Sequence, residues 1–199
     1  MSLSGDFALK FATKCNFVGG ETVEEERKPD VGGAAENAPA RCLAFYGSHE
    51  HSLDGKGRMI IPNAYRKALG NTFTVSITPE GDNIALYPDD VFDAMMDELN
   101  QLNNLNPSVR RYLSYLSKMS FRDVEPDSQG RILIPARLRQ RILKDAIKLE
   151  ISGRIDHVCI CDAQKGNDED DYFEENREDI VSDVSSLRAE LMSRKGDVR

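Results

Sequence analysis

The sequence predicts an α+β fold made of two copies of one strand–helix–strand unit, with helices between the copies and another helix in the C-terminal tail. Three observations lead to this prediction. One motif occurs twice, each copy contains a short apolar run rich in β-branched residues, and apolar rows with helical spacing separate the copies and return in the tail. A repeat of this kind normally marks a duplicated supersecondary unit, here expected to form a pseudo-symmetric β core.

The motif occupies residues 54–66 and 127–139, at a constant offset of 73 residues. Its two copies read D-G-K-G-R-M-I-I-P-N-A-Y-R and D-S-Q-G-R-I-L-I-P-A-R-L-R, with six identities in thirteen positions and no gap. The identical pairs are Asp54/Asp127, Gly57/Gly130, Arg58/Arg131, Ile61/Ile134, Pro62/Pro135 and Arg66/Arg139. The function is therefore expected to depend on what two copies of the unit do together.

Each copy begins with a turn, in which aspartate accepts backbone hydrogen bonds and the fourth-position glycine adopts dihedral angles that other residues avoid. The apolar runs 59–61 and 132–134 predict short strands, each ended by the proline of the motif. Short basic helices are expected at 63–69 and 136–144, because proline is tolerated in the first helical turn. Further strands are expected at 73–78, 84–87, 147–152 and 157–161.

Two helices are expected between the copies, at 89–105 and 108–119, each with its apolar residues on one face. Such faces ordinarily pack on the core, and contacts between subunits are the alternative. In the tail, an amphipathic helix is predicted by the spacing of Phe173, Ile180, Val184, Leu187 and Leu191. Two heptads do not establish a coiled coil, so packing on the protein's own body is expected. A second hypothesis is that this acidic helix competes with DNA for a basic face.

These features divide the chain into four parts. Residues 1–44 form a disordered N-terminal extension, and 45–106 contain the first repeat with its following helix. Residues 107–162 contain a helix and the second repeat, and 163–199 form an acidic tail with the amphipathic helix.

The first arginines of the two motif copies, Arg58 and Arg131, lie between a turn glycine and an apolar strand, so their side chains must leave the core. A local ion pair with Asp54 or Asp127 is the simpler interpretation, and such exposed pairs contribute little to stability. Alternatively, the two arginines and their basic neighbours form a cationic surface suited to phosphate or guanine. The candidate DNA-binding residues are Asp54, Lys56, Arg58, Arg66, Asp127, Arg131, Arg137 and Arg139.

Both motif copies, together with a Leu-Tyr-Pro segment at 86–88, resemble the MraZ family of bacterial transcription regulators, within the AbrB-like superfamily of swapped-hairpin β folds. The resemblance covers about residues 45–162. It implies sequence-specific binding of repeated short DNA boxes by a ring-like homo-oligomer, which regulates a cell-division and cell-wall gene cluster including its own gene. It also implies that Asp54, Arg58, Asp127 and Arg131 meet the DNA. The N-terminal extension, Phe92 in place of a tryptophan and the Cys159–Asp162 strand end depart from the family pattern.

The net charge of −8 is not evenly distributed. Residues 1–44 hold 5 basic and 7 acidic side chains, residues 45–161 hold 15 of each, and residues 162–199 hold 6 and 12. Because the local field decides where a polyanion docks, the acidic tails do not exclude double-stranded DNA as the partner. With no apolar run of membrane-spanning length and no disulfide pattern, we expect a cytoplasmic, nucleoid-associated protein without a membrane partner.

Other chemistries have weaker support. His157, Cys159 and Cys161 could converge on one strand face as metal ligands, or could be buried strand residues; no metal or other cofactor is expected. His49 and His51 precede the first turn and are expected to border the DNA face. No catalytic motif appears, so neither an enzyme nor a small-molecule substrate is expected. The alternative functions are an AbrB-type antitoxin or architectural module with a protein partner, and a pure assembly protein.

Overall fold

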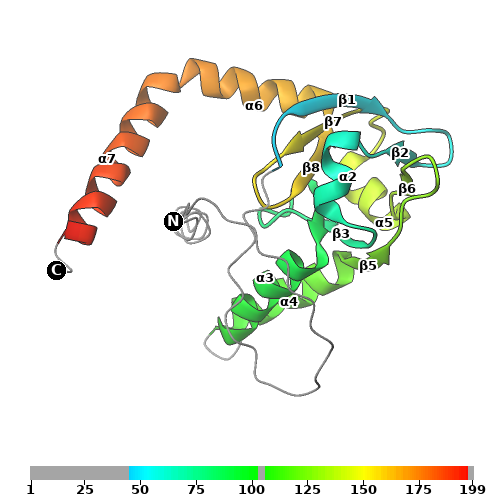
Figure 1. Ribbon diagram of the computed structural model, residues 1–199, viewed down its shortest axis with the longest axis horizontal. Coiled ribbons are helices and arrows are strands. Elements are labelled where there is room, and N and C mark those ends of the chain that lie inside the picture. The colour runs from blue at the N-terminus through cyan, green and yellow to red at the C-terminus, as the bar shows by residue number, and fades with distance from the viewer. Residues whose placement is uncertain (1–44, 103–105, 197–199) are drawn as a thin grey trace, which may run out of the picture. The chain divides into compact units, whose positions relative to one another are not determined.

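The protein is built on a six-stranded antiparallel sheet and a separate two-stranded ribbon (Figure 1). A computed structural model describes residues 45–102 and 106–196. In spatial order the sheet contains β1 (Ser48–Ser52), β7 (Lys148–Gly153), β8 (Val158–Asp162), β4 (Ile84–Pro88), β3 (Phe73–Ile77) and β5 (Phe121–Val124). The ribbon pairs β2 (Arg58–Ile60) with β6 (Arg131–Leu133). Together with the helices below, these elements confirm the α+β prediction. The predicted extension at 1–44 lies outside the described residues.

Strand pairing crosses between the two motif copies. Strand β1, which precedes the first motif, pairs with β7, which follows the second. Strand β5, which precedes the second motif, pairs with β3, which follows the first. Strands β4 and β8 pair with each other at the middle of the sheet. Each copy therefore supplies an edge strand to the sheet half of the other copy.

The two edge strands are absent from the sequence prediction. The β1 sequence, S-H-E-H-S, contains none of the apolar or β-branched residues that mark a strand, and its alternate side chains are half-buried. Its partner β7 lies about a hundred residues later, with Ser48 opposite Ser152 and Ser52 opposite Lys148. Long-range pairing thus forms β1 where local propensity does not.

The helices α2 (Asn63–Leu69), α3 (Asp89–Leu102) and α4 (Pro107–Met119) follow their predicted positions. In α4, Asn106 caps the N-terminus by accepting a bond from the Ser108 N–H, and Pro107 occupies the first turn. Both α3 and α4 pack on β3 or β4 through their buried apolar residues, as ordinary core helices do. The end of the predicted segment 89–105 lies outside the described residues.

The second motif's helix differs from the predicted single helix at 136–144. It consists of α5 (Ala136–Leu138) and a five-residue π-helix, η2 (Arg139–Leu143). The π turn is closed by a bond from the Lys144 N–H to the Arg139 carbonyl at 2.7 Å, five residues back, and Lys144 ends it with a φ of 53°. Whereas α2 has seven residues, α5 and η2 together have eight, and a π turn accommodates one extra residue.

The tail forms two helices, α6 (Ala163–Glu175) and α7 (Arg177–Gly196), separated at Asn176. Helix α6 packs on β7 and β8, where Gly166 lies against the Glu150 carboxylate. The single predicted helix is divided by the break at Asn176, so Phe173 lies in α6 and the rest of the predicted apolar row in α7. The row is exposed instead of packed on the protein's own body: Val184 is 58% exposed and Leu187 42%. The expectation that this row packs internally is wrong for the described residues. No helix among those residues combines the length and apolar character needed to cross a membrane.

Candidate nucleic-acid interface

The first motif begins with a turn that is organised by one carboxylate. Asp54 Oδ1 accepts hydrogen bonds from the backbone N–H groups of Lys56 at 2.8 Å and Arg58 at 2.9 Å. Its other oxygen, Oδ2, accepts from Arg58 Nε at 2.8 Å. The Gly57 N–H closes the turn on the Asp54 carbonyl, and Gly57 has a φ of +78°, a conformation that favours glycine. The turn therefore fixes both the backbone and the side chain of Arg58.

The second turn repeats this arrangement. Asp127 Oδ1 accepts from the N–H groups of Gln129 and Arg131, both at 2.9 Å, and Oδ2 accepts from Arg131 Nε at 2.8 Å. Gly130 closes the turn with a φ of +74°. The local ion pairs considered from the sequence are thus both present, as part of a larger hydrogen-bond set.

These bonds keep both aspartates ionised. The N–H of Arg58 is the main cause that lowers the pKa of Asp54 to about 2, assisted by the Arg58 guanidinium. The corresponding groups of Arg131 lower the pKa of Asp127. The carboxylates bind only the Nε side of each guanidinium, and neither arginine's Nη groups have a hydrogen-bond partner among the described residues. Two amino groups, Nη1 and Nη2, remain available to a ligand at the end of each arginine, with four N–H donors in all.

The β2–β6 ribbon brings the two arginines onto one surface. Arg58 lies opposite Leu133, and Arg131 lies opposite Ile60. Side chains alternate along each strand, so Met59 and Ile132 are buried while the outer row is accessible. We call Arg58, Ile60, Arg131 and Leu133 the outer ribbon face. Two cations and two aliphatic side chains alternate on it.

Sequence reasoning assigned Ile60 and Leu133 only to strand formation. In the folded protein, Ile60 is 43% exposed and Leu133 is 56% exposed. The sequence already indicated that Ile60 shares a face with Arg58, because side chains two residues apart in a strand lie on the same face. The outer ribbon face thus contains apolar as well as cationic groups.

The arginines at the end of each motif have a different environment. Arg66 Nε donates to the Ile61 carbonyl at 2.8 Å, and its Nη2 reaches the Gln129 carbonyl at 3.3 Å. A Cβ built on Gly130 would clash with Arg66 Cζ, so this guanidinium covers the turn of the other copy. Arg66 is therefore a structural clamp between the copies.

Arg139 makes the reciprocal contact. Its Nε donates to the Ile134 carbonyl at 3.0 Å, and a Cβ on Gly57 would clash with Arg139 Nη1. Backbone bonds from Ile61 N–H to the Gly130 carbonyl and from Ile134 N–H to the Gly57 carbonyl extend the same connection. Each turn is thus held in place by the other motif copy.

The remaining candidate residues are solvent-exposed. Lys56 lies at the tip of the first turn, where the second copy has Gln129, and Arg137 lies on α5. The two turns consequently present the same arginine geometry with one more cation at the first turn.

The histidines before the first turn both lie in β1 and are half-buried. Strand β1 places the His49 ring edge-on against Tyr65, with ring centroids 5.4 Å apart. Burial, followed by repulsion from His49, lowers the pKa of His51. Protonation of His51 is therefore disfavoured relative to an exposed histidine.

The possible metal ligands at the end of the second copy lie in the sheet. His157 bonds Asp156 through Nδ1 and lies against Tyr87, with ring centroids 4.9 Å apart. Burial raises the pKa of the Cys159 thiol to about 12 and that of Cys161 to about 11, which disfavours the thiolate that binds metals. Across residues 45–102 and 106–196, no three His, Cys, Asp or Glu side chains are grouped as a metal site would require.

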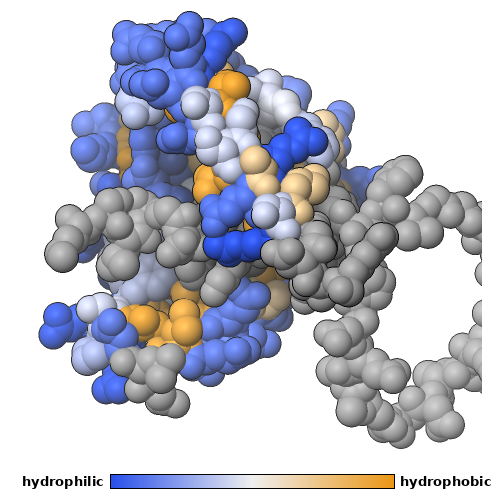
Figure 2. Space-filling view, turned by 90° about the vertical axis from the view of Figure 1, so that its left-hand side faces the viewer, coloured by the Kyte–Doolittle hydropathy of each residue, from blue (hydrophilic) through white to orange (hydrophobic). Residues whose placement is uncertain are grey.

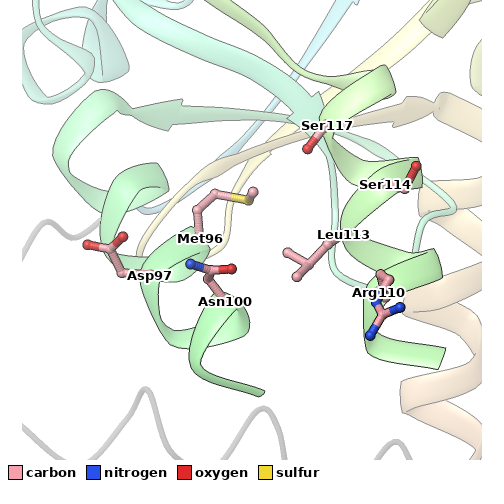
Figure 3. A pocket seen from close by; sticks show the side chains of 7 residues that line it. All are labelled: Met96, Asp97, Asn100, Arg110, Leu113, Ser114 and Ser117. Carbon is pink, nitrogen blue, oxygen red and sulfur yellow. The ribbon is translucent and has the colours of Figure 1, made fainter. Parts of the chain in front are cut away.

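A cavity of about 390 Å³ lies between α3 and α4, away from the candidate residues. Met96 and Leu113 point into it from facing helices, and polar groups such as Asn100 and Ser117 surround them (Figure 3). No pair of titratable groups converges in its lining, so it offers no evident catalytic chemistry.

Comparison with known proteins finds a matching family and several similar relatives. Residues 44–115 match the MraZ family, described as "MraZ protein, putative antitoxin-like". The chain is 35% identical over 114 residues to the transcriptional regulator MraZ of Pelotomaculum thermopropionicum, which covers 56% of this chain and 77% of the relative. The MraZ of Mycolicibacterium smegmatis is 31% identical over 134 residues, or 66% and 90% of the two chains. That of Natranaerobius thermophilus is 32% identical over 143 residues, or 70% and 96%.

Proposed function

The chain belongs to the MraZ family, and from this premise we propose that it is a transcriptional regulator that binds double-stranded DNA in a sequence-specific manner. The relatives are named transcriptional regulators, which supports the regulatory role. The observation that carries the proposal is the outer ribbon face, on which Arg58 and Arg131 are each held by an aspartate through Nε alone. Asp54 and Asp127 orient the arginines in this proposal.

A two-stranded antiparallel ribbon has the right width to enter the major groove. An arginine held through Nε presents both Nη groups forward, which is the geometry needed for two bonds to the O6 and N7 of one guanine. The exposed side chains of Ile60 and Leu133 are suited to contact thymine methyl groups beside these guanines. Lys56 and Arg137 would contact phosphates and position the duplex without reading it. Arg66 and Arg139 contribute chiefly by holding the turns.

The crossed strand pairing supports an AbrB-like swapped-hairpin arrangement, in which neither motif copy forms its half of the sheet alone. One protomer has two arginines, Arg58 and Arg131, that are proposed to contact bases, so its affinity for a single short box should be low. We propose a ring-like homo-oligomer that binds several boxes at once, because effective concentration raises avidity by about 10²- to 10⁴-fold. The proposed targets are boxes upstream of a cell-division and cell-wall gene cluster that includes the protein's own gene, in a cytoplasmic, nucleoid-associated setting.

The second candidate function is an antitoxin or architectural module whose main partner is another protein. The description of the matched family as antitoxin-like is the observation that favours it. In that case the outer ribbon face would bind a protein, and DNA binding would show little dependence on sequence.

The test is fluorescence anisotropy with a labelled duplex from upstream of the protein's own gene, against a shuffled duplex, at two salt concentrations. We expect tight binding of the native duplex, and loss of that preference in the double variant Arg58→Ala/Arg131→Ala. Each lost guanine contact should cost about 5- to 150-fold in discrimination. The oligomeric state should not change, since the Nη groups of both arginines have no partner in the described residues.

The matched control is Arg154→Ala. Arg154 is also exposed and ion-paired, to Glu169 on α6, but it lies outside the ribbon. This variant should bind the native duplex as the unmodified protein does. Equal binding of native and shuffled duplexes by the unmodified protein would overturn the proposal in favour of the protein-partner function. A double variant that loses assembly would assign the two arginines to structure.

A further inference from the structure

Helix α7 has an apolar row that no other described element covers. It consists of Ile180, Val184, Leu187 and Leu191, of which the last three are 58%, 42% and 39% exposed. Figure 2 views the side on which α7 lies in Figure 1, and shows hydrophobic residues at the surface among hydrophilic ones. A helix of this length gains most of its stability from packing an apolar face, so a covering partner is expected.

The spacing of the row identifies the kind of partner. Its members follow one another at intervals of four, three and four residues, which is the a/d pattern of a coiled-coil heptad. Ile180 and Leu187 take d positions, and Val184 and Leu191 take a positions. Val181 and Met192 are also exposed on α7 but fall beside the row, at e and b positions. The proposal therefore rests on the a/d spacing and not on a polar opposite face. The seam ends at Arg194, which occupies the next d position and bonds Glu190.

The charges beside the row decide between a parallel and an antiparallel pair. Asp183 falls at a g position and Arg188 at the e position of the next heptad. In a parallel pair, a g residue faces the following e residue of the partner, so Asp183 of each helix meets Arg188 of the other. In an antiparallel pair, g faces g, which would bring acidic Asp183 and Glu190 together. The charges therefore favour a parallel pair of identical helices.

We propose that α7 forms a parallel two-stranded coiled coil with α7 of a second copy of this chain. Helix α7 contains none of the residues assigned to the proposed DNA surface, which lie between positions 54 and 139, so this proposal does not depend on that surface. Two heptads bind weakly between free molecules. The pair therefore rests on the homo-oligomer proposed above, within which the effective concentration of neighbouring helices makes it stable.

Disulfide trapping tests the proposal in the full chain without DNA. In a Cys15→Ser/Cys42→Ser background, Leu187→Cys places a thiol at a d position of the seam. Cys159 and Cys161 stay, because both are buried. The matched control is Ser186→Cys, one residue away at an outward c position. Under mild oxidation, we expect disulfide-linked dimers to form on the order of 100-fold faster at position 187. The reason is that paired helices hold their thiols at a millimolar effective concentration, whereas thiols outside the seam meet only at the micromolar concentration of the protein. Equal rates at 186 and 187 would overturn the proposal.

A charge exchange provides the second measurement, without any further change to the apolar row. The background protein carries Leu187→Cys, and Arg188→Glu is added so that the new carboxylate of each helix would face Asp183 of the other. We expect trapping to slow several-fold, and adding Asp183→Lys to restore it, since the exchanged pair again joins opposite charges. If Arg188→Glu leaves the rate unchanged, or the exchange fails to restore it, the parallel pair is wrong. Circular dichroism of each variant separates lost pairing from lost folding.

Discussion

The turns at Asp54 and Asp127 hold their arginines by the same bonds, but the residues around the two turns differ. The Nε to Oδ2 distance is 2.8 Å in both, and the backbone bonds to Oδ1 agree within 0.1 Å. The first turn has Lys56 at its tip and a regular α-helix after it, whereas the second has Gln129 and a π-helix. What the two copies keep is the orientation of the arginine. What they vary is the charge beside it, which suggests that they bind the same kind of ligand with unequal phosphate contacts.

The clamps of the two copies also differ, and this gives the largest expected effect. Gly130→Ala and Gly57→Ala each place a side chain at positive φ, which costs about 1–3 kcal/mol. Both also displace a guanidinium, but Arg66 over Gly130 makes two hydrogen bonds and Arg139 over Gly57 makes one. We expect both variants to be less stable in urea unfolding and to bind DNA poorly, with Gly130→Ala the more destabilised.

The control for this comparison is Gly55→Ala, in the same turn as Gly57, where a new Cβ would have no atom within 4 Å. Its free energy of unfolding should change little. Adding Arg66→Ala to Gly130→Ala should relieve the clash and leave the cost of positive φ. If Gly55→Ala and Gly130→Ala are equally stable, the clamp across the copies has no energetic importance.

The sequence predicted those parts of the fold that depend on neighbouring residues. Helix α2 begins and ends where the pattern placed it, and β3 and β4 end within a residue of their expected limits. The aspartate–arginine pairs were also foreseen, because both partners lie within one turn. In each case the interaction spans only a few residues.

Features that join distant segments were not predicted. Strand β1 forms only because β7 supplies its hydrogen bonds, and Arg66 acts on a turn that lies more than sixty residues away. A basic residue in a motif looks the same in the sequence whether it meets phosphate or a carbonyl of the other copy. Alternation along the strand places Ile60 on the same face as Arg58, but only the packing of the ribbon shows that this face is exposed.

The outer ribbon face offers the next comparison, between Ile60 and Leu133. Each lies opposite an arginine of the other strand, and each is exposed. If they contact thymine methyl groups, replacing those thymines by uracil should weaken binding by about fourfold per methyl group, from about 0.8 kcal/mol. Ile60→Ala and Leu133→Ala should each lose sensitivity at one position of the box. Variants that distinguish thymine from uracil as well as the unmodified protein does would remove this role.

The smallest expected effect concerns the one charge by which the turns differ. Exchanging the residues separately, as Lys56→Gln and Gln129→Lys, leaves the aspartate bonds intact because only the backbone N–H at these positions is used. If Lys56 contacts a phosphate, its loss should reduce the slope of log K against log salt by about 0.9, and Gln129→Lys should increase it by a similar amount. Titration of the native duplex from low to moderate salt gives both slopes. Because phosphate contacts carry no sequence information, the ratio of native to shuffled binding should stay constant in both variants. A changed ratio would mean that the turn tip itself reads bases, and the difference between Lys56 and Gln129 would then be one of specificity.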